Sequence, residues 1–406
     1  FVTSGDVTNP LVCTAGATEL TLQGRIDRAN AGDTITLSSD TEIAATLQIT
    51  KNLTLDLNGH VLKMTDSGSG SVLYVKKDGP DTVTLTITDS RPQNPHGSYA
   101  GLPAGGVITG GEGTDVPGIH YVGGAVYLKE GTTLKLEGGT LTGNSCSSIY
   151  IGGAILVMSG GTITGETVGV HNNVGTFKMT GGRITGCSDR GVYVYNGNMT
   201  MSGTAYIGGN PNARKEDIYV YESDHKHTDL SVTGGTIAGN VRIVFLESLR
   251  PTQDELKAAA NSVVKEQGVF DGHIKVEKGT SGICVDYNSV NFIDEVANTR
   301  TLKLVLQPNA VEEPETPATV NGQAFKYWVA KGSSEAWNFE APLEVPLTLY
   351  AVRTPASSGG YYYYPTTDTK ADDAKGSPKT ADPGVALYAA LSILSLTGLT
   401  CATKKR

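Results

Sequence analysis

The sequence predicts an all-β fold in which a short coil of strands repeats and stacks into a solenoid. Five similar stretches carry this prediction, and most of their first glycines lie about 22 residues apart: Gly138, Gly160, Gly181, Gly203 and Gly234. Apolar and polar residues alternate within each stretch, as in strands with one buried face. A unit of this length holds three strands of roughly five residues with their turns. Each strand is expected to pair in parallel with its equivalent in the next coil.

Alignment of the five stretches predicts three columns of inward side chains. Two columns precede the glycine corner, where positive φ is required, and one follows it. The first contains Leu134, Leu156, Phe177, Met199 and Leu230. The second contains Leu136, Met158, Met179, Met201 and Val232. The third contains Leu141, Ile163, Ile184, Ile207 and Ile237.

These stretches, of which 156–166 reads LVMSGGTITGE, resemble the repeats of right-handed parallel β-helix proteins on gut bacterial surfaces. The resemblance implies the right-handed winding and a triangular cross-section, because the period alone predicts only a stacked β coil. We assign residues 35–300 to this solenoid. Between two of its early strands, the Pro- and Gly-rich stretch 89–104 predicts an insertion, which is either a tolerated surface loop or a functional one.

Composition excludes some classes of function. The chain has 406 residues and a formal net charge of −9, so it lacks the basic surface that nucleic acid requires. Its five cysteines, at positions 13, 146, 187, 284 and 401, are too scattered to predict a disulfide framework. We expect no cofactor and no metal site. His225 and His227 share one face of a short stretch, but no third ligand accompanies them, and a solvated loop is the preferred interpretation.

Two helices are predicted at the edges of the solenoid. Residues 1–34 form an N-terminal segment with a capping helix, in which Leu22, Ile26 and Ala29 lie on one side and Gly32 follows the end. Such a helix would protect the open strand edges of the first coil. The second helix spans 252–268, where Thr252 and Glu255 form a capping box. It is either a cap of the solenoid or an excursion from one coil.

Residues 301–353 differ in composition from the repeats. Their aromatic residues and the ending Leu347 to Ala351, LTLYA, resemble the Listeria–Bacteroides repeat. The resemblance implies a small β-rich module of bacterial surface proteins that serves as a spacer or contacts a ligand. Residues 354–376 are predicted to be a flexible linker, because they contain too few apolar residues to fold alone.

The end of the chain has three parts in order. Residues 385–402 are mostly apolar and long enough to cross a bilayer, and the basic residues Lys404, Lys405 and Arg406 follow them. Before the apolar segment stands a short block: Ser377, Pro378, Lys379, Thr380 and Ala381. Residues 377–406 therefore resemble a sortase sorting signal of Gram-positive bacteria. The resemblance implies cleavage after Thr380, covalent attachment to peptidoglycan outside the cell, and only transient contact with the membrane. A plain membrane tail is the alternative.

An outward column of aromatic rings precedes the glycine corners. Its members lie at one position of successive coils: Tyr74, Tyr127, Tyr150, His171, Tyr193 and Tyr219. Tyr195 and Tyr221 lie two residues further along and widen the column. Exposed rings with hydroxyl groups suit sugar rings, so the column predicts binding of a glycan or a host surface by an adhesin-like surface protein. The competing interpretations are an aromatic ladder that only stabilises the sheet, and a passive structural stalk.

The weaker hypothesis is an enzyme of the polysaccharide hydrolase or lyase type. Its candidate catalytic residues are Asp189, Arg190, Glu216 and Asp217, in corners beside the ring column. We expect Asp189 and Asp217 at near-equivalent positions of adjacent coils, where they could act as the carboxylate pair of a glycoside hydrolase. Charged corners are more often simply solvated, and the fold alone does not imply a reaction.

Overall fold

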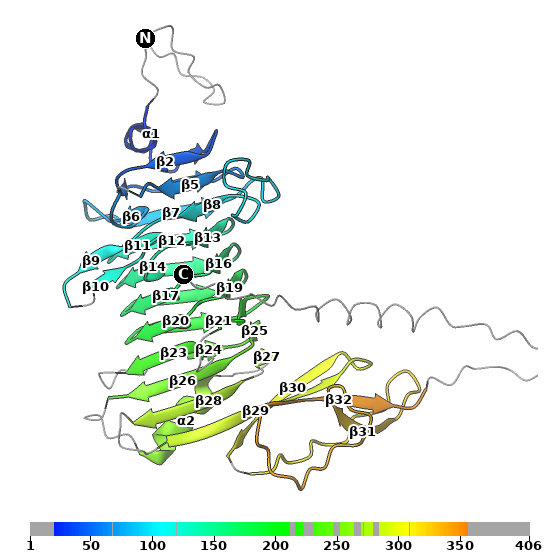
Figure 1. The fold of residues 1–406 in the computed structure, drawn as a ribbon. Coiled ribbons are helices and arrows are strands. Elements are labelled where there is room, and N and C mark those ends of the chain that lie inside the picture. Colours follow the sequence, from blue (N-terminus) through cyan, green and yellow to red (C-terminus); the bar gives the residue numbers. More distant parts are fainter. Residues whose placement is uncertain are drawn as a thin grey trace, which may run out of the picture. The chain divides into compact units, whose positions relative to one another are not determined.

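The computed structural model describes residues 20–355, apart from 67, 119, 212–215, 223–229, 247–251, 264–268, 271, 279–283 and 308. The described chain is mostly β, with three sheets of parallel strands that stack coil upon coil (Figure 1). The predicted sorting signal and the predicted linker, except for its first two residues 354 and 355, lie outside the described residues. Within residues 20–355, no helix is both long and apolar enough to span a bilayer.

Sheet A has eight strands, which open each coil: β1 (Thr34–Thr36), β4 (Leu53–Asp56), β7 (Val83–Thr88), β12 (Thr132–Leu136), β15 (Ile155–Met158), β18 (Thr176–Met179), β21 (Asn198–Met201) and β24 (Leu230–Val232). Sheet B has nine strands, which follow the glycine corner: β2 (Thr41–Ile43), β5 (Val61–Met64), β8 (Val107–Thr109), β13 (Thr140–Thr142), β16 (Thr162–Thr164), β19 (Arg183–Thr185), β22 (Tyr206–Ile207), β25 (Thr236–Ile237) and β27 (Val269–Phe270).

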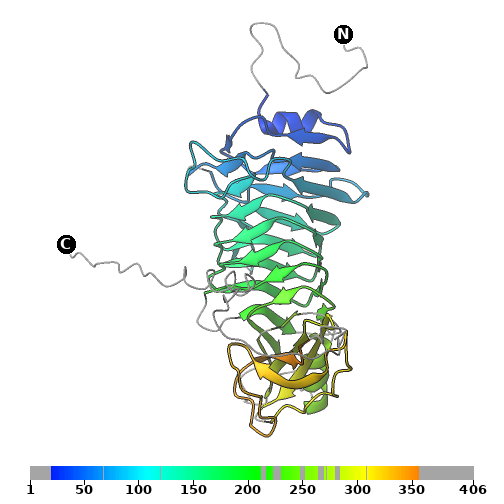
Figure 2. The same ribbon diagram turned by 90° about the vertical axis from the view of Figure 1, so that its right-hand side faces the viewer.

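Sheet C has thirteen strands, of which the first nine close the coils: β3 (Leu47–Ile49), β6 (Leu73–Val75), β11 (Val126–Lys129), β14 (Ser147–Gly152), β17 (Val168–Asn173), β20 (Arg190–Tyr195), β23 (Glu216–Glu222), β26 (Asn240–Phe245) and β28 (His273–Lys278). The chain visits sheets A, B and C in turn, so equivalent strands become neighbours (Figure 2). This topology agrees with the predicted parallel β-helix.

The core lies between the three sheets. All fifteen predicted inward side chains are buried, and the largest that is fully buried is Phe177. The registers pair like with like, as in Leu156 beside Phe177 and Ile163 beside Ile184. The period-two pattern therefore predicted the three inward columns correctly, because only one face of each strand can reach the core.

Helix α1 (Leu22–Arg28) covers part of the first coil. Leu22 and Ile26 are buried as predicted, and the Thr21 hydroxyl caps the helix by accepting from the Gly24 backbone N–H at 3.1 Å. The helix ends at Arg28, before the predicted end at Gly32, because Ala29 already has an extended backbone. The amphipathic pattern thus located the helix but overestimated its length.

The insertion predicted at 89–104 packs against the outer side of sheet B. Its first residue, Asp89, is an anchor whose carboxylate accepts from the backbone N–H groups of Gly59 at 2.7 Å and Gly106 at 2.6 Å. At its far end, the Tyr99 hydroxyl donates to Glu42 at 2.8 Å. A second insertion, the antiparallel hairpin β9 (Thr114–Val116) and β10 (His120–Val122), follows β8 and precedes β11.

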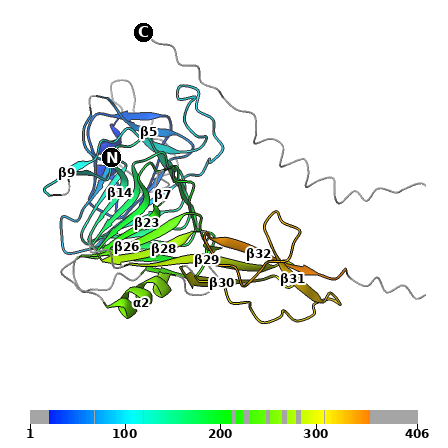
Figure 3. The same cartoon turned by 60° about the horizontal axis from the view of Figure 1, so that its bottom comes forward.

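Helix α2 (Gln253–Val263) closes the other end of the core. The predicted capping box is present, since Glu255 accepts from the Thr252 backbone N–H at 2.7 Å and Thr252 accepts from that of Glu255 at 3.2 Å. Leu256 and Ala260 are fully buried against the last coil. In the chain the helix follows β26 and precedes β27, where the next strand of sheet A would be expected. It lies beside β28 at the end of the coils (Figure 3).

A smaller core follows the coils and shares sheet C with them. Strand β29 (Cys284–Asp294) pairs antiparallel with β28 of the last coil and with β30 (Thr299–Leu306), and parallel with β32 (Leu347–Arg353). Strand β31 (Phe325–Ala330) pairs with β32. Phe292, Trp328 and Leu349 are buried together in this second core. The predicted boundary at 300 falls inside β30, and β29 pairs with strands of both regions.

Candidate functional site

The predicted ring column runs along the outer face of sheet C. Its register is continuous through the first eight strands after β3, and the residues at this position are Tyr74, Tyr127, Tyr150, His171, Tyr193, Tyr219, Arg242 and Lys275. The centroids of neighbouring rings are 4.7 to 5.4 Å apart. The ring column is therefore in contact from β6 to β23, as the repeat alignment predicted.

The rings meet in two kinds of contact. Tyr127 and Tyr150 are stacked at 5.1 Å with an interplanar angle of 7°, whereas Tyr150 and His171 meet edge to face at 87°. A centroid separation above 4.5 Å in a parallel pair is an offset stack, which leaves part of each ring face uncovered by its neighbour. Burial and neighbouring tyrosines raise the pKa values of Tyr127 and Tyr193 to about 12, so both phenols remain hydrogen-bond donors at neutral pH.

Tyr150 differs from the other members of the column. Its side chain is only 2% exposed, because the ring lies over Gly152 and its hydroxyl accepts from Asn173 Nδ2 at 2.6 Å. The sequence predicted Tyr150 as a glycan contact. The structure covers this side chain, which would need to be displaced before it could touch a sugar.

His171 occupies the column between Tyr150 and Tyr193. Burial, with a smaller effect from the nearby Arg190 cation, lowers its pKa from 6.5 to about 4. The imidazole is therefore neutral at pH 7, and it packs against the neighbouring tyrosine rings as an uncharged aromatic ring. Its predicted contact with a glycan would be a neutral one.

The widest part of the aromatic surface lies on β20 and β23. Tyr193 pairs with Tyr219, and Tyr195 pairs with Tyr221, so that two columns meet on two adjacent strands. The Tyr195 and Tyr221 rings are stacked at 5.6 Å and 7°, and all four side chains are half-buried. We call these four residues the tyrosine platform. In this part of the predicted site, partly exposed rings are neighbours both along one strand and across two paired strands.

Charged residues border the platform on one side. The Arg190 guanidinium lies 4.2 Å from the Tyr219 ring centroid, where a cation is attracted by the ring face. Arg190 also forms an ion pair with Asp189, and it lies 3.6 Å from Glu216. Arg242 donates to the same Glu216 at 3.1 Å. The predicted catalytic residues Asp189, Arg190 and Glu216 therefore come together, but as an ion-pair network that holds Tyr219 in place.

The predicted carboxylate pair is not formed. Asp217 lies next to Gly191, and its side chain is 1% exposed and accepts from Asn210 Nδ2 at 2.6 Å. Asp189 is half exposed at the corner before β20. Asp217 lies in β23 at an irregularity of the pairing between Glu216 and Ile218, and it is buried there. The structure therefore does not support the expected pairing of Asp189 and Asp217 at near-equivalent positions of adjacent coils, because one carboxylate is exposed and the other is buried.

A polar column inside the corners between sheets B and C was missed. It consists of the residues that end four of the repeat stretches: Asn144, Glu166, Cys187 and Asn210. Glu166 accepts from the Asn144 backbone N–H at 3.0 Å, and Asn210 accepts from that of Cys187 at 2.8 Å. Asn144 likewise accepts from the Gly111 backbone N–H at 3.1 Å, so these three side chains each satisfy a buried backbone group of the preceding coil. An Asn or Glu that follows the last glycine in four of the five repeats was the available signal.

Burial changes the acidity of this inner column. It raises the pKa of Glu166 from 4.5 to about 7, against the lowering effect of the Asn144 hydrogen bonds. It also raises the pKa of the Cys187 thiol to about 12. Glu166 is only 1% exposed, so this carboxyl group with its raised pKa is inaccessible to a substrate.

In the described part of the chain, no group of three or more His, Cys, Asp or Glu side chains could hold a metal ion. The candidate pair His225 and His227 lies outside the described residues, as do the five residues of the predicted sorting motif. Comparison with protein-family models, with curated proteins and with solved structures found no match to this chain. The chemistry of the ring column and the platform is therefore the basis for a functional interpretation.

Proposed function

We propose that this chain is a protein of the bacterial surface that binds a glycan on the outer face of sheet C. The observation that carries the proposal is the tyrosine platform, where Tyr193, Tyr195, Tyr219 and Tyr221 lie half-open on two paired strands. Tyrosine combines an apolar ring with a hydroxyl that donates and accepts, which matches the two kinds of surface on a sugar. The stacked strands hold the rings at fixed spacing, so little ordering is needed on binding.

The shape of the face favours an extended ligand. Rings recur once per coil, and a strand spacing of about 4.8 Å is similar to the length of one sugar unit in a linear polysaccharide. A glycan lying along the coils would meet the platform first and could continue toward Tyr74 and Tyr127. The covered Tyr150 interrupts the contact between these two parts.

The arrangement of carboxylates gives little support to the alternative of a hydrolase or lyase. Asp217 is buried against Asn210, and Glu216 is buried between two arginines. A glycosidase needs two carboxyl groups that both reach the sugar. We therefore propose binding without turnover.

The proposal also includes presentation on a cell wall. The coils are proposed to wind as a right-handed parallel β-helix, and residues 377–406 are proposed to be a sortase signal that attaches the chain to peptidoglycan of a Gram-positive bacterium. The resemblances of the repeats and of the tail support these parts. Incubation with a sortase and an amine acceptor tests the tail: cleavage after Thr380 is expected, and an intact chain would contradict it.

The binding proposal is tested by incubating the purified chain with mucin, plant and microbial polysaccharides. Bound polysaccharide and released reducing sugar are measured in the same wells. Binding without release is the expected outcome. Release that is lost in Asp189→Asn would establish an enzyme instead, and the absence of both signals across the panel would leave the ring column with only a structural role.

A further inference from the structure

The strand edges at the N-terminal end of the coils are covered unequally. At β3, the Gln23 side chain imitates a neighbouring strand, since its amide accepts from the Gln48 backbone N–H at 2.8 Å and donates to the Gln48 carbonyl at 3.2 Å. At β1, Arg25 donates to the Thr36 carbonyl at 2.7 Å. Helix α1 thus supplies partners to two of the three edge strands.

The third edge strand, β2, lacks such a partner among the described residues. It pairs with β5 alone, and the Ile43 carbonyl accepts from Thr65 on that side. Because neighbouring residues of a strand direct their backbone groups to opposite edges, the N–H and C=O of Glu42 face away from β5. An unpaired strand edge is a template for pairing with another extended segment.

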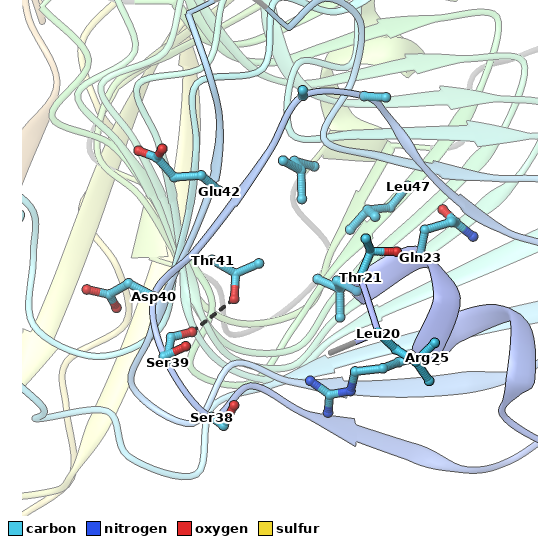
Figure 4. A pocket seen from close by; sticks show the side chains of 14 residues that line it. Leu20, Thr21, Gln23, Arg25, Ser38, Ser39, Asp40, Thr41, Glu42 and Leu47 are labelled. Carbon is cyan, nitrogen blue, oxygen red and sulfur yellow. Dashed lines mark hydrogen bonds between the residues drawn. The ribbon is translucent and has the colours of Figure 1, made fainter. Parts of the chain in front are cut away.

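A cavity of about 580 Å³ lies along this open edge (Figure 4). It is lined on one side by residues 20–23 and 25 around the start of α1, and on the other by residues 38–45 and 47, which include β2. Leu22, Ile43 and Leu47 contribute apolar surface, and Thr41 and Glu42 contribute the strand edge. The cavity therefore offers both backbone partners and an apolar contact.

The core is incompletely covered at the same place. Ile43 is 9% exposed and Leu22 is 6% exposed, whereas the inward residues of the middle coils are fully buried. At the opposite end, Leu256 of α2 and Ile274 of the last coil are also fully buried. The N-terminal end thus has room for one more layer of chain.

The segment before Leu20 is the occupant that the connectivity favours. Leu20 itself lines the cavity, and residues 1–19 directly precede it in the chain. Residues 11–14, Leu-Val-Cys-Thr, are strand-favouring and stand between Pro10 and Gly16. Five residues separate Thr14 from Leu20, and they can span up to about 17 Å. That reach is sufficient to bring residues 11–14 beside β2.

We propose that residues 11–14 pair with the open edge of β2 as one more strand of sheet B and fill the cavity beside α1. This contact completes the N-terminal cap that α1 provides for β1 and β3. The inference is independent of the glycan proposal, because it concerns the opposite end of the coils from the tyrosine platform.

The chain's own Cys13 allows a direct test. Adjacent strands lie about 4.8 Å apart, within the Cα separation that a disulfide allows. Thr41→Cys and Glu42→Cys, made singly in the full chain, sample both faces of β2, and Ala44→Cys samples the position just after it. Ser334→Cys on the distant module is the matched exposed control. After mild oxidation, peptide mapping is expected to find an intrachain disulfide from Cys13 to at least one β2 position and none to position 334.

Hydrogen exchange supplies a second readout that needs no new cysteine. Val12→Pro and Cys13→Pro each remove one backbone N–H of the segment, and one of them points toward β2. At least one variant is expected to accelerate exchange of the Glu42 amide by about tenfold, the effect of roughly one net hydrogen bond. Thr3→Pro is the control and is expected to leave the rate unchanged.

Three results would overturn the proposal. Disulfides that form between chains would assign the edge to a second copy. Cys13 that reacts no better with the β2 positions than with position 334 would remove the segment from the cavity. Exchange at Glu42 that is equally fast in the parent chain and in both proline variants would show that the edge is open.

Discussion

The outer faces of sheets B and C differ, although the same coils build both. Inside, the two sheets are alike, since Ile163 and Ile184 of sheet B and Val170 and Val192 of sheet C are fully buried. Outside, sheet B carries Thr142, Thr164 and Thr185 in register, where sheet C carries rings. The threonines show that a small β-branched residue is enough at an outward position. The rings of sheet C therefore exceed what the coils need to fold.

Stability alone gives a weak reason for the rings. Cross-strand pairs of threonines and of aromatic residues each contribute roughly 0.2 to 1 kcal/mol. The difference between the two faces is thus small in folding free energy and large in exposed ring surface. This contrast is the main argument for a ligand on sheet C.

The largest expected effect comes from the shared interior. Phe177→Ala removes the largest fully buried side chain and should lower the free energy of unfolding by about 3 to 5 kcal/mol. The same loss should weaken sheets B and C alike, because both pack on this core. Denaturant titration of the variant and of Lys178→Ala, an exposed neighbour, makes the comparison. A Phe177→Ala chain as stable as the Lys178→Ala chain would contradict the assigned core.

The buried Glu166 should make stability depend on pH. Its folded pKa of about 7 lies above the ordinary 4.5, so between pH 4.5 and 7 the folded state keeps a carboxyl proton that the unfolded state has lost. The contribution of Glu166 to the free energy of unfolding is complete below pH 4.5 and falls by at most about 3 kcal/mol as the pH rises to 7. Glu166→Gln should abolish this fall. Denaturation at pH 4.5, 6 and 7.5 measures it, with Glu137→Gln as the exposed control.

His171 should give a slope of opposite sign. Its folded pKa of about 4 lies below the ordinary 6.5, so the unfolded state binds a proton first as the pH falls. Stability should therefore rise between pH 4 and 6.5, again by at most about 3 kcal/mol, and remain level above. His171→Tyr extends the tyrosine column and should remove this rise. A variant with the parent's pH profile would show that His171 is accessible to protons in the folded state.

The smallest expected effect is the difference in side-chain coupling energy between the outer faces of sheets C and B. A double-mutant cycle between Tyr127→Ala and Tyr150→Ala should give a coupling energy of about 0.5 to 1.5 kcal/mol, because the rings stack. The matched cycle between Thr142→Ala and Thr164→Ala should give less. Equal coupling energies would mean that ring stacking adds nothing to the sheet.

The repeated pattern determined how far sequence reasoning could reach. Phe177 and Ile184 were placed in the core because alternation with period two leaves only one face for it. Tyr193 and Tyr219 were aligned correctly because equivalent strands pair in register. Both inferences use a regular feature that every coil repeats.

Departures from regularity could not be predicted in the same way. Asp217 is buried at an irregularity of β23, where the period-two rule no longer applies. Tyr150 is covered because Gly152 and Asn173 flank it, and no other tyrosine of the ring column has that combination. Glu166 could have been recognised as part of an inner column, since a polar residue ends several repeats.

The central claim is that the tyrosine platform binds the ligand. The most direct measurement is the affinity of the full chain for the best polysaccharide of the panel, compared between Tyr195→Ala/Tyr221→Ala and the sheet B control Thr142→Ala/Thr164→Ala. We expect the tyrosine variant to bind at least about tenfold more weakly, a loss of about 1.4 kcal/mol, and the threonine variant to bind as the parent does. Equal affinities in all three chains, with unchanged stability, would contradict the claim.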